Sequence, residues 1–494
     1  MVSGFTDGLS DDKFSTSNKS EKKYYDLVII GGDVAGLAAV AKYREIVGSD
    51  KRIAYVSIDL LGDLVRASSE ILSNYLVEVT KIRSWARIYD DLCCFEGFEF
   101  SKILDRLRIF SENNMKRRFE RVFERYNVDL FIGSAKFVSR KDLVVKSSGG
   151  EVFIEGAFYI LAPGSTPIIP DVEGFNEIRY YTTETIWGIN DLPRELLIVG
   201  SEPLGLEIAQ AFNRLGSEVH IIESSERILS IAEPEISREL SDVLSEEGVK
   251  IYTNARVTRF SRSGSRISAR ISRHDESFEK EFDAVLLALG RVPKTDDLGL
   301  DHAGVELDKR GYVKVSKDLR TSNPRIYAAG DVVGTPKTIS TQLISVKEGC
   351  VVAENIASHR KKSVDYDLIP VVIHTDPEVA FVGYTEQRLF KALGMSSHRI
   401  VRFDATLKSD LIGVRRGLAK IIIDPREKKI LGFHVMAPNA SEFITVASLL
   451  IKHGYRAKEV MELAHIYPAS YELLKLSAHL VFSNPDEYLH HLHQ

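Results

Sequence analysis

Residues 25–47, YDLVIIGGDVAGLAAVAKYREIV, contain the pattern that decides the fold of this chain. The short apolar run 25–30 predicts a buried strand, the glycines after it predict a tight turn, and residues 37–47 predict a helix. A strand, a glycine turn and a helix in this order open a βαβ unit of the dinucleotide-binding kind. In such a unit a phosphate lies at the N-terminus of the helix, where backbone N–H groups are free to bind it.

The same pattern recurs roughly 170 residues further along the chain. Residues 196–199 (LLIV) lead into Gly200 and Gly205, a helical stretch follows, and residues 218–222 predict a second strand. Two such units predict binding sites for two nucleotides.

Length, charge and cysteine content exclude several classes of protein. The chain has 494 residues, which at about 150 residues per domain predicts roughly three domains. A net charge of −5 without a basic stripe argues against a nucleic-acid partner. The sequence has no long apolar run and no signal-peptide pattern, and its 3 cysteines do not suit a disulfide framework. We therefore expect a cytoplasmic protein with no membrane partner.

Five further segments complete an ordered set of motifs. They are ILAPGSTP (160–167), LALGRVPKT (287–295), RIYAAGDVVG (325–334), IPVVIHTDPEVAFVG (369–383) and HIYPASYE (465–472). Together with the two glycine turns, these segments occur in the same order as the motifs of the class-I pyridine nucleotide-disulfide oxidoreductases. The chain therefore resembles that family. The resemblance implies an α/β fold with two Rossmann-like dinucleotide-binding domains and a C-terminal α+β dimerisation domain.

The resemblance also implies domain boundaries and cofactors. We expect a disordered tail at 1–24, an FAD-binding domain at 25–170 and 296–363, an NAD(P)-binding domain at 171–295, and a dimerisation domain at 364–494. FAD would bind to the first βαβ unit and NAD(P)H to the second, and two chains would form a homodimer.

Carried over residue by residue, the resemblance implies two sets of cofactor-binding positions. The FAD set is Gly31, Gly32, Gly36, Gly164, Gly330 and Asp331. The NAD set is Gly200, Gly205, Glu223 and Gly290. Asp331 stands where the family places an aspartate against the ribityl and phosphate region of the flavin. Glu223 ends the second strand of its unit, where an acid binds the ribose hydroxyls and favours NAD over NADP.

The second glycine of the family pattern is Asp33 in the first unit and Glu202 in the second. Two unit charges about 4 Å apart at an effective dielectric constant near 20 repel by roughly 4 kcal/mol, so a carboxylate here opposes a pyrophosphate. Two interpretations stay open. The carboxylates either accept hydrogen bonds from the backbone N–H groups in place of a phosphate, or point to solvent and weaken nucleotide binding.

The segment that the family uses for redox chemistry lacks the two cysteines and the lysine of the family. Leu64 and Ser69 occupy the two cysteine positions, and Ser73 replaces a lysine that pairs with the glutamate here numbered Glu207. Serine does not perform thiolate chemistry, so this segment cannot reduce disulfides. We expect Glu207 to be unpaired or exposed. Ser57 likewise replaces the acid that would bind the ribose of FAD, and nearby Asp59 is the alternative candidate for this role.

The His-Pro and glutamate dyad of the family reads Tyr467-Pro468 and Glu472 here. A phenol with an ordinary pKa of about 10 is a poor general base at neutral pH. Tyr467 and Glu472 are nonetheless the catalytic candidates that the resemblance implies, and we predict no metal site.

We therefore predict an FAD-dependent NAD(P)H oxidoreductase that passes hydride from nicotinamide to flavin and on to an unidentified small-molecule acceptor that is not a disulfide. The alternative is a degenerate, non-catalytic member of the family that acts as a dimeric scaffold or regulator with impaired nucleotide sites.

Overall fold

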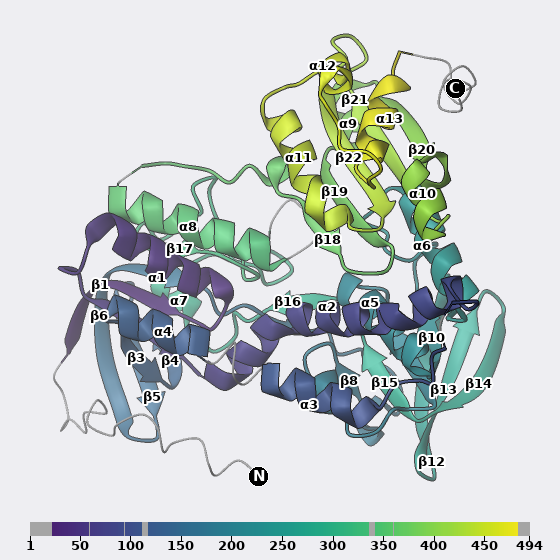
Figure 1. The fold of residues 1–494 in the computed structure, drawn as a ribbon. Coiled ribbons are helices and arrows are strands. Elements are labelled where there is room, and N and C mark those ends of the chain that lie inside the picture. Colours follow the sequence, from purple (N-terminus) through teal and green to yellow (C-terminus); the bar gives the residue numbers. More distant parts are fainter. Residues whose placement is uncertain are drawn as a thin grey trace.

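The structure is a computed structural model that describes residues 22–58, 60–92, 94–110, 117–334, 341–358 and 360–482, without the side chains of 60–68 and 117–120. Most of the predicted tail and the side chain of Leu64 lie outside the described residues. The described residues group into three bodies, built around the first sheet, the second sheet and the C-terminal sheet (Figure 1). None of the described helices combines the length and the apolar character that crossing a membrane requires.

The first sheet carries the first glycine turn. Its strands, in spatial order, are β3 (Asp129–Ile132), β2 (Ile53–Ser57), β1 (Lys23–Ile30), β6 (Gly150–Leu161), β5 (Asp142–Ser147) and β4 (Ser134–Phe137), and β17 (Ile326–Ala328) also pairs with β6. The pairs of β1 with β2 and β6, of β2 with β3, and of β6 with β17 are parallel. The last four residues of β1 are buried, as expected of a central parallel strand.

Helices α1 (Val34–Val47) and α8 (Gln342–Ser358) lie side by side over this sheet (Figure 1). They approach closely because Gly349 of α8 has no side chain: a Cβ there would lie 2.1 Å from the Ala35 carbonyl oxygen. Helix α4 (Arg117–Tyr126) also contacts α1, and α7 (Leu300–Ala303) contacts β4.

The second sheet carries the second glycine turn and is parallel throughout. Its order is β11 (Lys250–Tyr252), β10 (Glu218–Ile222), β9 (Glu195–Val199), β15 (Ala284–Leu287) and β8 (Tyr181–Thr182). Helices α5 (Pro203–Leu215) and α6 (Pro234–Glu247) belong to this body. An antiparallel sheet of β12 (Ala255–Ser263), β13 (Arg266–Arg273) and β14 (Glu276–Phe282) adjoins it.

Helix α2 (Leu60–Ile88) runs from the first body to the second and packs against α5 (Figure 1). Helix α3 (Phe100–Phe110) follows α2 and contacts it. The short strands β7 (Ser165–Pro167) and β16 (Arg291–Pro293) pair antiparallel. Since β7 follows β6 and β16 follows β15, this pair connects the first sheet to the second.

The C-terminal body is an antiparallel sheet with helices. The strand order is β18 (Val371–Ile373), β19 (Glu378–Gly383), β22 (Ile430–Ala437), β21 (Leu418–Ile423) and β20 (Ser397–Arg402). The helices are α9 (Glu386–Leu393), α10 (Leu407–Ile412), α11 (Ala440–Lys452), α12 (Ala457–Glu462) and α13 (Glu472–His479). The predicted fold class is therefore confirmed, while the residue boundaries of the three domains stay predictions.

Candidate functional site

A cavity of about 780 Å³ lies where the three bodies meet. The two glycine turns contribute Gly32 and Asp33 from the first unit and Gly200 and Glu202 from the second, and His374 comes from the C-terminal body. The two units, which are far apart in sequence, thus share one cavity.

The first glycine of each turn is required by a close approach of the backbone. Gly31 has a φ of +122°, and a Cβ there would lie 2.0 Å from the Ala162 carbonyl oxygen. Gly200 has a φ of +96°, and its Cβ would lie 2.1 Å from the Ala288 carbonyl oxygen. Any larger residue would force apart the strands that form the cavity floor.

The remaining glycines predicted for cofactor binding are of two kinds. Gly36 and Gly205 lie inside α1 and α5, and a Cβ on Gly205 would lie 2.4 Å from the Ala288 side chain, so it serves helix–strand packing. Gly330 also serves packing, because a Cβ there would lie 2.3 Å from Asp33 Oδ2. Gly164 and Gly290 line the cavity. Their role in cofactor binding stays a prediction.

Asp33 is the N-cap of α1, and its carboxylate binds backbone N–H groups from two segments. Oδ1 accepts a hydrogen bond from Ala35 N at 3.2 Å, and Oδ2 accepts one from Asp331 N at 3.1 Å. Burial, followed by the charge of Asp331, raises the pKa of Asp33 to about 7. The carboxylate therefore occupies amides that could bind a phosphate and does not point to solvent.

Glu202 makes a different contact in the second unit. Its Oε2 accepts a hydrogen bond from Gly290 N at 3.0 Å, at the turn that follows β15. No side chain caps α5, and Pro203 fills its first helical position. Burial raises the pKa of Glu202, although Arg291 and the Gly290 hydrogen bond act in the opposite direction. This carboxylate also faces the protein, but it leaves the end of its own helix uncapped.

Among the described residues, the acid predicted to bind ribose is present only in the second unit, and Asp59 of the first unit lies outside them. Glu223 is buried on the cavity wall, where it accepts hydrogen bonds from Ser201 Oγ at 2.6 Å and from Ser225 N at 2.7 Å. The corresponding residue at the end of β2 is Ser57, which is buried as well. The two units therefore differ in the group that could hold a ribose.

Carboxylates dominate the charged groups on the cavity wall. They belong to Asp33, Glu70, Glu184, Glu202, Glu207, Glu223 and Asp331. Arg291 is the one arginine or lysine among the described residues of this wall. The cavity is strongly acidic, which opposes the binding of a phosphorylated ligand unless some carboxyl groups are protonated.

Arg291 links the two units, and the sequence analysis did not identify it. Its Nε donates to Ser165 Oγ at 2.6 Å, and its guanidinium is paired with Glu184. Ser165 Oγ in turn donates to Asp331 Oδ2. The motif GRVP places Arg291 directly after a cavity glycine, which is the signal that could have singled it out.

The segment that replaces the disulfide forms part of α2. Ser69 is buried and its Oγ accepts a hydrogen bond from Trp187 Nε1 at 3.1 Å. Ser73 is buried and donates to Glu207 Oε2. The expectation that Glu207 is unpaired or exposed is wrong: it is 4% exposed, and its Oε1 also accepts from His374 N at 2.7 Å. A serine hydroxyl and a backbone N–H take the place of the missing ammonium group.

Tyr467 and Glu472 lie away from the cavity of their own chain. Tyr467 is 63% exposed, whereas Glu472 is buried and accepts a hydrogen bond from Ala469 N at 2.8 Å. Burial raises the pKa of Glu472. Neither residue lines the cavity, so their catalytic role stays a prediction that requires the cavity of a partner subunit.

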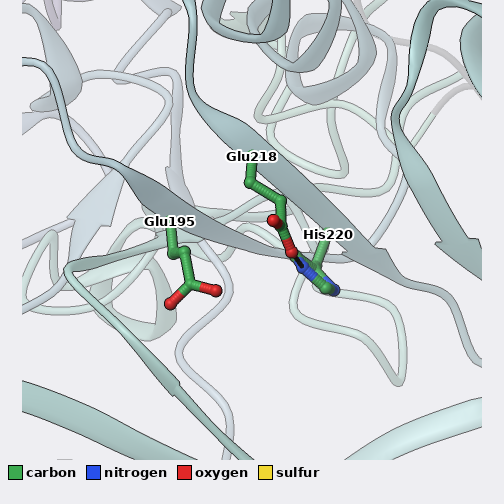
Figure 2. Close-up of side chains that lie close together, drawn as sticks. All are labelled: Glu195, Glu218 and His220. Atoms are coloured by element: carbon green, nitrogen blue, oxygen red, sulfur yellow. Dashed lines mark hydrogen bonds and ion pairs between the residues drawn. The ribbon is translucent and has the colours of Figure 1, made fainter.

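A cluster of Glu195, Glu218 and His220 at the start of β9 and β10 has the residue types of a metal site (Figure 2). Its carboxylates are already paired with cations. Lys280 Nζ lies 2.6 Å from Glu195 and 3.1 Å from Glu218, and Lys250 Nζ lies 2.6 Å from Glu218. We interpret the cluster as an ion-pair network.

A second cluster consists of Glu235, Glu386 and His398, and a buried lysine lies against it. Lys420 is buried, and its Nζ lies 2.7 Å from Glu386 and 3.0 Å from Glu235. An ammonium group thus occupies the position that a metal ion would take.

Comparison with known proteins places the chain among flavoprotein reductases. The sequence model described as pyridine nucleotide-disulphide oxidoreductase matches residues 25–348, and that of the dimerisation domain of this family matches residues 369–478, which indicates a homodimer. The mercuric reductase of Streptomyces lividans is 30% identical over 92% of this chain and 95% of that protein. The mitochondrial dihydrolipoyl dehydrogenase of Pisum sativum is 29% identical over 93% of this chain and 92% of that protein.

Among solved structures, the chain is similar to the Cu(II) complex of the HOCl-induced flavoprotein disulfide reductase RclA from Escherichia coli. The TM-score is 0.81 at 23% identity, with 93% of this chain and 100% of that chain covered. This similarity supports the fold.

Proposed function

Because the chain belongs to the pyridine nucleotide-disulphide oxidoreductase family, we propose that it is an FAD-dependent NAD(P)H oxidoreductase that passes hydride to an acceptor other than a disulfide. Members of this family use FAD and NAD(P)H. The low cysteine content supports a cytoplasmic location as part of this proposal.

The observation that carries the proposal is the shared cavity. Both glycine turns open into the same space of about 780 Å³, so dinucleotides on the two units would bring their reactive ends together. When bound, NAD(P)H supplies the hydride and FAD supplies the ring that accepts it. The protein contributes binding and orientation.

In the first unit, Gly31 permits the close approach of the turn to the Ala162 carbonyl oxygen, and Gly32 and Asp331 line the cavity where FAD would bind. The pyrophosphate position differs, because Asp33 binds the N–H group of Ala35 and that of Asp331. A pyrophosphate can bind there only if the Asp33 carboxyl turns away or becomes neutral. A pKa of about 7 makes the neutral form available near physiological pH.

The acceptor is proposed from what α2 lacks. Ser69 and Ser73 supply hydroxyl groups where the family has a cysteine and a lysine, and a serine hydroxyl does not exchange electrons with a disulfide. The acceptor therefore has to react directly at the cavity, as a quinone or a dye does.

A second candidate function rests on the same carboxylates. Asp33 already satisfies the N–H groups of Ala35 and Asp331, and Glu202 satisfies that of Gly290, which supports a member of the family that acts as a dimeric scaffold without bound nucleotides. The two candidates differ in whether the cavity binds FAD and NAD(P)H at all.

Turnover separates the candidates. We expect NADH oxidation with a quinone or dye acceptor, and background rates with lipoamide or glutathione disulfide. Disulfide turnover on the order of 10 per second would contradict the proposed acceptor class. Failure of the protein to retain FAD, together with the absence of NADH oxidation with every acceptor, would favour the scaffold.

A further inference from the structure

One side of the cavity holds a group of ionisable side chains that the preceding account does not use. His374 follows β18 and lines the cavity, and three carboxylates act on it from three elements: Glu70 of α2, Glu207 of α5 and Glu378 of β19. This group lies next to Ser73, which replaces the lysine of the family.

His374 is held in place at its backbone, and its ring lies beside a buried carboxylate. Its backbone N–H donates to Glu207 Oε1 at 2.7 Å. Its ring Nδ1 lies 3.7 Å from Glu378 Oε1 and has no hydrogen-bond partner within the described residues. Glu378 is 6% exposed, and its other oxygen accepts from Ser441 N at 2.8 Å. A fixed carboxylate thus lies beside an imidazole on the cavity wall.

This group lacks the cation that the family places beside Glu207. Burial raises the pKa of Glu207, although the Ser73 hydrogen bond and the charge of His374 act in the opposite direction. Ser73 offers Glu207 a hydroxyl where the lysine would offer an ammonium group. Burial alone would lower the pKa of His374, but Glu378, Glu207 and Glu70 together outweigh burial and raise it.

Charges further from His374 act on its neighbours. Burial would raise the pKa of Glu378, but His374, then Ser441 and the more distant Lys81, outweigh burial and lower it. Burial, followed by the charges of Glu207 and Asp331, raises the pKa of Glu70 to about 7. His374 is the one group among these neighbours of Glu207 that becomes positively charged when it binds a proton, and the surrounding carboxylates favour that form.

We propose that His374 is the proton-carrying residue of the cavity: it supplies the positive charge that the missing lysine would supply, and it donates a proton to the reduced acceptor. The proposal rests on the proposed function. Two-electron reduction of an acceptor A by NAD(P)H and one proton gives NAD(P)⁺ and AH₂. The hydride supplies both electrons and one hydrogen nucleus, and the second proton comes from the His374 ring, which takes a proton back from water.

The pair of His220 and Glu218 provides a matched control within the same chain. His220 lies beside Glu218 (Figure 2), with its Nε2 2.8 Å from the carboxylate, and Glu218 is also paired with Lys250 and Lys280. It does not line the cavity, and burial lowers its pKa. The two histidines each face a glutamate, but their pKa values are shifted in opposite directions, upward for His374 and downward for His220.

The first experiment measures the protonation of His374 without any turnover. Histidine NMR on isotope-labelled full-length protein, with resonances assigned through His374→Gln and His220→Gln, should place the pKa of His374 above its ordinary value of about 6.5. Glu378→Gln should lower this pKa, and Glu218→Gln should leave it unchanged. A His374 pKa that does not respond to Glu378→Gln would overturn the assigned charge.

The second experiment measures proton delivery. The kcat for NADH and a quinone should fall above the His374 pKa in the wild type, and His374→Gln should lower kcat on the order of a hundredfold and remove this pH dependence. The KM for NADH should change less than about threefold. His220→Gln should keep the wild-type pH profile. Identical profiles for the wild type and His374→Gln would overturn the proposal.

Failure of the proposed function has a different signature. Protein that cannot be loaded with FAD would retire the oxidoreductase, and with it proton delivery, while the NMR titration would still support or contradict the assigned cation.

Discussion

The two βαβ units carry the same kind of substitution and use it differently. In the first unit Asp33 caps its own helix and also binds Asp331 N, so one carboxylate holds two amides. In the second unit Glu202 bypasses its helix and binds Gly290 N. The first unit has therefore lost more of its phosphate-binding capacity than the second.

The ends of the second strands show the same imbalance. Glu223 provides a buried carboxylate in the second unit, and Ser57 provides a hydroxyl in the first. A similar sequence pattern therefore does not guarantee similar binding. The side chain in place of the second glycine matters less than the amides that it reaches.

The largest expected effect tests what the units share. Gly31→Ala and Gly200→Ala should each lower the free energy of unfolding by about 3 kcal/mol, because the new Cβ meets a carbonyl oxygen and the backbone has a positive φ. Gly150→Ala is a matched control, because Gly150 has a φ of +120° and nothing within 4 Å of its Cβ. Denaturant unfolding that shows equal losses at all three positions would contradict the close approach.

The next effect separates the units. Asp33→Gly should tighten FAD binding tenfold or more, with an upper bound of roughly 4 kcal/mol, because it frees two amides and removes a negative charge. Glu202→Gly should tighten NADH binding by about tenfold. Calorimetric titration of each variant with the other nucleotide is the control and should show changes below about threefold. No tightening at either site would retire the role of these carboxylates as phosphate substitutes.

A pH dependence should distinguish the first unit. The pKa of Asp33 is raised to about 7, so acidification neutralises this carboxyl and favours the binding of a pyrophosphate. The affinity of the wild type for FAD should rise roughly tenfold as the pH falls by about two units through this value. Asp33→Asn should bind FAD with a flat profile, and a wild-type affinity that falls on acidification would contradict the assigned cause.

The smallest effect concerns the ribose. Glu223→Gln should weaken NADH binding about threefold, because it removes the charge that strengthens a hydrogen bond to a ribose hydroxyl. Ser57→Ala should leave FAD affinity unchanged, since Ser57 supplies no carboxylate. Equal losses in the two titrations would indicate that the units do not differ here.

Much of the fold was predictable because its signals are local. The apolar run before Gly31 and the helix after it define a βαβ unit within about 25 residues, and the same holds at Gly200. The interactions of the site are not local. Asp33 binds an amide 298 positions away, so the sequence could raise the two interpretations of this carboxylate but could not choose between them.

The site residues that the sequence analysis missed have the same explanation. Glu207 was expected to lack a partner, because the loss of the lysine is visible in the sequence. Its contact with His374 N joins residues 167 positions apart and is not visible in the sequence. Arg291 and His374 gain their importance only from the cavity that assembles around them.

The most direct test of the central claim is the visible spectrum of the protein after incubation with FAD and removal of the excess. We predict a yellow protein with one FAD per chain, whose flavin absorbance is lost on anaerobic addition of NADH, because both nucleotides meet in one cavity. Wild type and Asp33→Asn that both stay colourless at mildly acidic pH would contradict the account, as would bound flavin that NADH does not reduce.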